Sequence, residues 1–243
     1  MDGCLPIHYF VFQVVLLRNH TFQNPYSGNH GIITLRITLQ VTKNNQIRLS
    51  KIQSYVMHTL MNHTVSFRNA LPEDAVFISR GFHTAMLYED TPESQILTFA
   101  EKICRREDTL YSWRNTILAV VDGNPVGMIT SYEGSRYHEM RVLTLHLVKE
   151  HLGIEFPDME DEASAGEYYL DSLAVLSSLR GMGIGRSLLH QGILRGQSLG
   201  LPVTLAVDPV NVRAQKLYRS LGFEPHGALF IFGHTYWKWI FRQ

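Results

Sequence analysis

The sequence is poor in the residues and patterns that mark several common protein classes. Its 243 residues include only two cysteines, Cys4 and Cys104, too few for a disulfide framework or a cysteine metal cluster. The twelve histidines form no H-E-x-x-H pair, so no metal site is expected. Basic and acidic residues are equal at 22 each, so the chain has no net charge to attract nucleic acid or an anionic membrane.

The chain also lacks an apolar run long enough to cross a bilayer. The candidate nearest the start, residues 5–17, is interrupted by His8 and Gln13, whereas a spanning helix needs about 20 apolar residues. Asp2 stands where a signal peptide would carry positive charge, and no small-residue cleavage site follows cleanly. We therefore expect a cytoplasmic protein without a membrane partner.

Residues 1–60 lack alanine, glutamate and tryptophan, which makes them an atypical N-terminal extension. Residues 31–41 alternate in the manner of a strand, so an accessory β-subdomain is one interpretation. The other is an upstream stretch translated from an early start codon, with Met57 or Met61 as the true beginning. We favour the second, because ordinary helices and surfaces use alanine and glutamate freely. It predicts that a chain starting at Met61 is as soluble and active as the full one.

Residues 64–243 have the sequence pattern of one folded domain, in which segments of helical periodicity alternate with segments of strand periodicity. Helices are expected at residues 71–88, 93–106, 135–152, from 183 onward, and at 211–221. Strands are expected at residues 65–69, 115–121, 125–132, 170–176, 202–207, 223–232 and 234–240. This order predicts an α/β fold, with a mixed central β-sheet flanked by α-helices.

The domain is organised around the turn between the strand at 170–176 and the helix that follows it. The turn contains Arg180, Gly181, Gly183 and Gly185. The first N–H groups of a helix have no internal partners, and the helix dipole favours negative charge there. Glycines let those groups approach a phosphate closely. The stretch therefore predicts a pyrophosphate site, to which Arg180 and Arg186 add charged donors.

Two common types of phosphate loop do not match this turn. A P-loop requires a lysine, and none lies near this turn. The dinucleotide pattern G-x-G-x-x-G fails in both registers, because positions 186 and 188 are Arg and Leu. The pattern that fits is [QR]-x-x-G-x-[GA], met by Arg180, Gly183 and Gly185. It resembles the pyrophosphate loop of the GNAT family of acyl-CoA-dependent N-acyltransferases.

A second segment supports the resemblance. Residues 211–223 are similar to the family's N-x-x-A-x-x-L/F-Y-x-x-x-G-F segment. The residues of this segment also predict a helix without the resemblance. Asn211 is a good N-cap, Tyr218 lies on the apolar face, and Gly222 is at the position where helices commonly end in a left-handed conformation.

The resemblance implies the GNAT fold and acetyl-CoA as the acyl donor, with no metal. The backbone of Leu173, Ala174 and Val175 would hold the pantetheine arm. The pyrophosphate would be held by Arg180, Gly181, Met182, Gly183, Ile184, Gly185, Arg186 and Ser187. Asn211 matches a position that often bonds the cofactor arm, although an N-cap role explains it equally well.

The resemblance also implies catalytic roles. Acyl transfer needs a donor for the carbonyl oxygen, a base for the ammonium and an acid for the leaving thiolate. Tyr218 matches the family's acid, with a core tyrosine as the structural alternative. Asp171 and Glu167 are candidate bases, lying on one face if the strand is regular; a water chain or a purely structural role for Asp171 stays open. The acidic run at 155–167 is either a solvated loop or an acidic lip that attracts an amine.

Two non-enzymatic alternatives remain at this point. One is an acyl-CoA-binding module without turnover, and the other a regulator that binds a nucleotide phosphate through the loop. For the enzyme, the sequence does not identify the acceptor, which is expected to be a small-molecule or peptide amine. Members of the family often form dimers, so the resemblance also agrees with a homodimer.

Overall fold

The structure is a computed structural model, and it describes residues 14–16, 64–83, 93–156, 160–231 and 233–242. The chain divides into two units: residues 1–17 with 65–243, and residues 18–64. Only the first is described below. The strand expected at 31–41 and the two candidate start residues, Met57 and Met61, lie outside the described residues.

The described residues alternate between strands and helices, as the sequence predicts. The strands are β1 (Val14–Leu16), β2 (Ser66–Asn69), β3 (Thr116–Val121), β4 (Asn124–Glu133), β5 (Tyr168–Val175), β6 (Val203–Val207), β7 (Phe223–Ile231) and β8 (His234–Phe241). The helices are α2 (Ala75–His83), α3 (Glu93–Cys104), α4 (Tyr137–Leu152), α5 (Ile184–Ser198) and α6 (Val212–Leu221).

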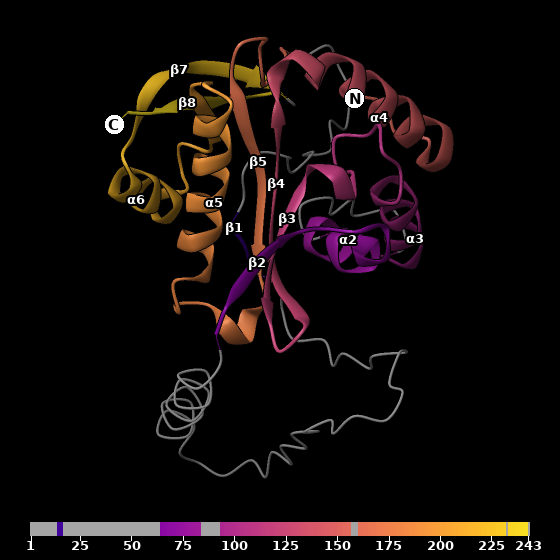
Figure 1. Ribbon diagram of the computed structural model, residues 1–243. Coiled ribbons are helices and arrows are strands. Elements are labelled where there is room, and N and C mark those ends of the chain that lie inside the picture. The colour runs from indigo at the N-terminus through magenta and orange to yellow at the C-terminus, as the bar shows by residue number, and fades with distance from the viewer. Residues whose placement is uncertain (1–13, 17–63, 84–92, 157–159, 232, 243) are drawn as a thin grey trace, which may run out of the picture. The chain divides into compact units, whose positions relative to one another are not determined.

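The strands form one mixed sheet in the order β2-β3-β4-β5-β6-β8-β7, and β1 pairs separately with β5. The pairs β5–β6 and β1–β5 are parallel, and the others are antiparallel. Helices α5 and α6 lie on one side of the sheet, and α2 and α3 lie on the other (Figure 1). The expected α/β fold with a mixed, helix-flanked sheet is confirmed.

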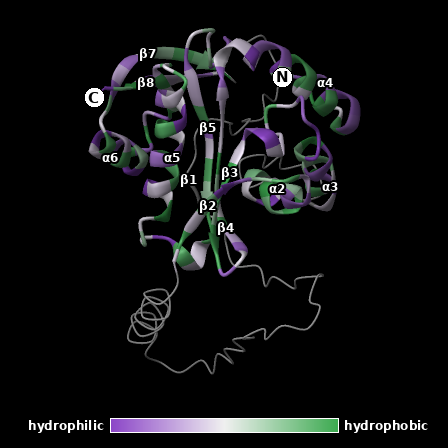
Figure 2. Cartoon of the chain, in the orientation of Figure 1, coloured by the Kyte–Doolittle hydropathy of each residue, from purple (hydrophilic) through white to green (hydrophobic). Residues whose placement is uncertain are grey.

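The core lies on both faces of the central strands. Every residue of β3 and β6 is buried, and hydrophobic residues are frequent in the central strands (Figure 2). Helix α5 packs on β3, β4 and β5. Two glycines allow this close approach: a Cβ on Gly196 would lie 2.5 Å from Val203 and 3.0 Å from Tyr168, and one on Gly192 would lie 2.7 Å from Leu170.

Several element ends follow the local signals. The helix expected from residue 71 begins as a 3-10 turn at Pro72–Asp74 and continues as α2. The backbone N–H of Leu71 donates to the Asp74 carboxylate over 2.8 Å, and this contact fixes the helix start. Helix α4 ends at Gly153, whose φ of 69° is left-handed.

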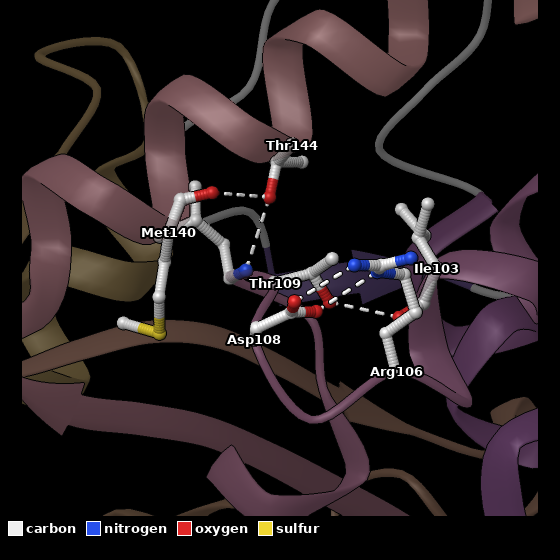
Figure 3. Close-up of polar contacts among 7 residues, drawn as sticks. Ile103, Arg106, Asp108, Thr109, Met140 and Thr144 are labelled. Atoms are coloured by element: carbon white, nitrogen blue, oxygen red, sulfur yellow. Dashed lines mark hydrogen bonds and ion pairs between the residues drawn. The ribbon is translucent and has the colours of Figure 1, made fainter.

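Polar contacts tie the loop after α3 to α4. The Thr144 hydroxyl donates to the Met140 carbonyl at 2.6 Å and accepts the backbone N–H of Leu110 at 3.1 Å. The Thr109 hydroxyl donates to the Ile103 carbonyl at 2.8 Å (Figure 3). Because these groups are buried, the contacts satisfy backbone atoms that would otherwise lose their water.

Two negative findings concern the described residues alone. No helix among them has the length and apolar character to cross a membrane. Within the same residues, no three His, Cys, Asp or Glu side chains gather as metal ligands would.

We predict that Gly196→Val destabilises the protein by roughly 1–3 kcal/mol, because the new side chain overpacks the α5–sheet contact. Chemical denaturation monitored by circular dichroism measures the change. Leu194→Val is the matched control, since it places the same side chain on the exposed part of α5. Equal stability of the two variants would contradict the close packing.

Candidate active site

The sheet opens beside the middle of β5. Strand β5 pairs with β6 only through Tyr168 and Tyr169, whereas its other edge stays paired with β4 along the whole strand. Beyond Tyr169 the edge that β6 leaves is paired with β1, and Leu173, Ala174 and Val175 face Val14, Val15 and Leu16 in register. Any extended ligand that binds this edge must therefore replace β1.

A β-bulge sets the direction of Asp171. Along the β4–β5 pair, Thr130 is opposite Ser172 and Ser131 is opposite Leu170, so Asp171 is the extra residue on β5. A bulge redirects side chains and interrupts the strict alternation of a strand. The strand is therefore not regular at Asp171, and the condition under which Asp171 and Glu167 would lie on one face is not met.

Asp171 is a buried carboxyl that accepts two hydroxyl hydrogen bonds. Ser172 donates to one oxygen over 2.6 Å, and Tyr132 of β4 donates to the other. The side chain is 8% exposed, and burial raises the pKa of Asp171 above its ordinary value against the opposing effect of these two bonds. A carboxylate with a raised pKa is a better proton acceptor near neutral pH.

The glycine turn leads into α5 as the sequence predicts. Gly181 and Gly183 have φ angles of 81° and 83°, and Gly183 is the N-cap of α5 without a side-chain cap. A Cβ at Gly183 would meet nothing within 4 Å, so the backbone angle, and not a lack of space, requires glycine there. The first N–H groups of α5 therefore face a glycine turn that leaves them accessible to an anion.

The two arginines of the turn differ in their contacts. Arg180 donates from Nε to the Val175 carbonyl at 3.3 Å. Burial, and then the neighbouring charge of Arg213 on α6, lowers the pKa of Arg180. Arg186 instead donates to the hydroxyl and carbonyl of Ser220 on α6, at 2.7 and 2.9 Å. The charged donor expected from Arg186 is thus engaged between α5 and α6, and Arg213 stands beside Arg180.

Helix α6 carries the second motif in the expected places. The Asn211 side chain accepts the N–H of Ala214 at 3.1 Å, which confirms its role as N-cap, and Gly222 ends the helix with a φ of 103°. Tyr218 is fully buried and makes edge-on ring contacts with Phe223 and Trp239 at centroid distances of 6.1 and 6.4 Å. Burial raises the pKa of Tyr218 well above its ordinary value, so its phenol keeps its proton.

Glu167 is held by an ion pair that the sequence did not reveal. Its carboxylate accepts Lys238 Nζ of β8 at 2.5 Å and the backbone N–H of Ser164 at 2.6 Å. Both side chains of the pair are 11% exposed. A buried carboxylate with these partners is committed to holding the loop before β5 against β8.

The solvated-loop interpretation of residues 155–167 is wrong for Glu162 and Glu167, which are only 8% and 9% exposed. Glu162 accepts the hydroxyl of Tyr169 at 2.7 Å and that of Tyr137 at 3.3 Å. Tyrosine hydroxyls and Lys238 replace the water that a solvated run would need. The acidic composition gave no signal that separates these two residues from their exposed neighbours.

Comparisons with known proteins agree with the two motifs. A sequence model described as the acetyltransferase (GNAT) family matches residues 82–223, more than half of the chain. The chain belongs to this family. The match spans the glycine turn and ends at Phe223, so the turn and α6 both lie inside the GNAT region.

Individual relatives are distant. A mycothiol acetyltransferase of Thermobifida fusca (strain YX) is 29% identical over 141 residues, which are 58% of this GNAT chain and 38% of that protein. The chain thus spans well under half of this relative's length. An N-acetyltransferase from Staphylococcus aureus Mu50 has a TM-score of 0.63 at 26% identity, covering 72% of this chain and 99% of that one. A further acetyltransferase structure has a TM-score of 0.62 at 25% identity, with coverage of 73% and 98%.

The different contacts of the two arginines generate a prediction for coenzyme A binding. Arg180→Met should weaken binding at least about tenfold, because it removes a charged donor from the glycine turn, while Arg186→Met should weaken it less. Isothermal titration calorimetry measures both dissociation constants. An equal or larger loss in Arg186→Met would show that its guanidinium leaves Ser220 to bind the cofactor.

The pairing of β1 generates a second prediction. A chain starting at Met61 should bind coenzyme A at least as tightly as the full chain, because β1 no longer occupies the edge of β5. Val15→Pro in the full chain is the matched variant, since proline removes a backbone donor and weakens strand pairing. Isothermal titration calorimetry measures the dissociation constant of coenzyme A for the three proteins. Weaker binding by the shorter chain would contradict competition between β1 and the cofactor.

Proposed function

We propose that this chain transfers an acetyl group from acetyl-CoA directly to a primary amine. The observation that carries the proposal is the end of the β5–β6 pairing at Tyr169, because Leu173 and Val175 beyond it lie beside Gly185 in the first turn of α5. Once β1 is displaced, the strand edge at residues 173–175 offers N–H and C=O groups to the amides of the pantetheine arm. The glycine turn offers the N-terminus of α5 to the pyrophosphate.

The cofactor contacts follow the order of the chain. Leu173, Ala174 and Val175 bond the pantetheine arm in place of β1, and the turn from Gly181 to Ser187 receives the pyrophosphate. Arg180 and Arg213 supply positive charge at the turn, and their mutual repulsion is relieved when the anion lies between them. Asn211 supports the site by starting α6.

The proton steps use one base and one acid. Asp171 takes a proton from the acceptor's ammonium, and the freed amine attacks the thioester carbonyl. A backbone N–H of β5 donates to the carbonyl oxygen as negative charge develops. The C–N bond forms, the C–S bond breaks, and Tyr218 gives its proton to the departing sulfur. The second proton of the attacking nitrogen is released as the amide forms, and one proton from solvent returns to the Tyr218 phenolate, so that the step balances. Asp171 is preferred over Glu167 as the base because the Glu167 carboxylate is already paired with Lys238.

The experiment is a thiol-release assay with acetyl-CoA over a panel of small amines, peptide N-termini and protein lysines. The proposal predicts free thiol only when an acceptor amine is present. Binding of coenzyme A without amine-dependent release would favour a non-catalytic acyl-CoA-binding module. Competition by ATP instead of coenzyme A would favour a nucleotide-phosphate regulator.

With an acceptor in hand, we predict that Tyr218→Phe lowers kcat by roughly 10²–10⁴-fold, the usual contribution of a general acid. The ring contacts with Phe223 and Trp239 survive the change, so the dissociation constant of coenzyme A should stay within about twofold. Steady-state kinetics and calorimetry measure the two effects. An unchanged kcat would assign Tyr218 to the core alone.

A further inference from the structure

Two buried carboxyl groups share one cluster of tyrosines beside the bulge of β5. Asp171 accepts the Tyr132 hydroxyl, and Glu162 accepts those of Tyr137 and Tyr169. The three rings pack on one another, with centroid distances of 6.0, 6.0 and 6.5 Å. All five side chains are at most 8% exposed. The cluster joins β4, α4, β5 and the loop before β5.

The cluster contains more acid than neighbouring positive charge. The charge of Arg141 on α4 acts on Glu162, but its guanidinium is paired with Asp161. Lys238 of β8 donates to the backbone carbonyl of Glu162 at 3.1 Å, and its charge is balanced by Glu167. Because both of these cations are already paired with other carboxylates, two ionised carboxylates in one buried cluster are costly, so one proton is expected to remain.

The hydrogen bonds indicate which carboxyl keeps that proton. Each carboxyl accepts one close hydroxyl bond, from Ser172 to Asp171 at 2.6 Å and from Tyr169 to Glu162 at 2.7 Å. The second bonds differ, because Asp171 also accepts Tyr132, whereas the bond from Tyr137 to Glu162 is 3.3 Å long. Short bonds from hydroxyl donors stabilise the ionised form of the acceptor. Burial, and then the charge of Asp171, raises the pKa of Glu162 to about 8, in agreement with the geometry.

We propose that Glu162 is a positioning residue that acts through Asp171. It holds a proton while Asp171 carries the single negative charge of the tyrosine cluster, and in this way it keeps Asp171 ionised as the base. This inference rests on the proposed function, in which Asp171 accepts the proton of the acceptor's ammonium. In that step the N–H bond breaks and the Asp171 O–H bond forms, while the proton of Glu162 stays in place.

The first test is infrared spectroscopy, which detects a protonated carboxyl group by its C=O stretch and needs no turnover. In the native protein this band should be present at neutral pH and should disappear as the pH rises through about 8. Glu162→Gln should lose the titrating band, and Glu139→Gln, an exposed change on α4, should keep it. A titrating band that persists in Glu162→Gln, or that the native protein lacks, would overturn the inference.

The second test is the pH profile of kcat/KM for the native enzyme and Glu162→Gln. Because glutamine resembles a protonated glutamate, the acid limb should keep its midpoint in the variant, while any transition near pH 8 disappears. A shift of the acid limb to lower pH would show that Glu162 is ionised in the working enzyme, and this would overturn its role.

The two proposals fail on different observations. Absence of amine-dependent thiol release overturns the proposed function. Absence of the titrating carboxyl band overturns the role of Glu162, whether or not an acceptor has been found. Binding of coenzyme A by Glu162→Gln confirms that the variant is folded and that a changed pH profile reports on the site.

Discussion

The structure depends on the short pairing between β5 and β6, which on β5 includes only Tyr168 and Tyr169. A strand inside a sheet normally has backbone partners on both edges, and unpaired buried N–H and C=O groups are costly. After Tyr169, β5 gives up this partner, and residues 173–175 pair with β1 instead. The opening lies where the helix dipole of α5 and the glycine turn converge. A ligand with both amides and phosphates, as coenzyme A has, matches the opening and the turn together.

The chemistry of the site depends equally on what is buried around the opening. The bulge directs Asp171 into the tyrosine cluster on one side. Tyr218 of α6 is held by the rings of Phe223 on β7 and Trp239 on β8, and its burial keeps the phenol protonated. In the proposed mechanism Asp171 is a base with a raised pKa and Tyr218 is an acid that keeps its proton, and amine acylation uses both kinds of group. Packing thus supplies both protonation states without a metal among the proposed participants.

Local patterns in the sequence were sufficient for the elements and motifs. Periodicity placed the helices and strands, and cap chemistry placed Asn211 and Gly222 at the ends of α6, as the structure confirms. Such local patterns could not predict contacts between residues that are far apart in the sequence. Lys238 is 71 positions from Glu167, and the burial of Glu162 depends on how α4 and β5 pack together. The bulge at Asp171 is a property of the β4–β5 register, which no single strand encodes.

The most direct measurement is a crystal structure of the chain with coenzyme A bound. We predict that the pyrophosphate lies at the glycine turn that opens α5, and that the pantetheine arm lies along residues 173–175 in place of β1. Continued pairing of β1 with β5 while coenzyme A binds elsewhere would contradict it.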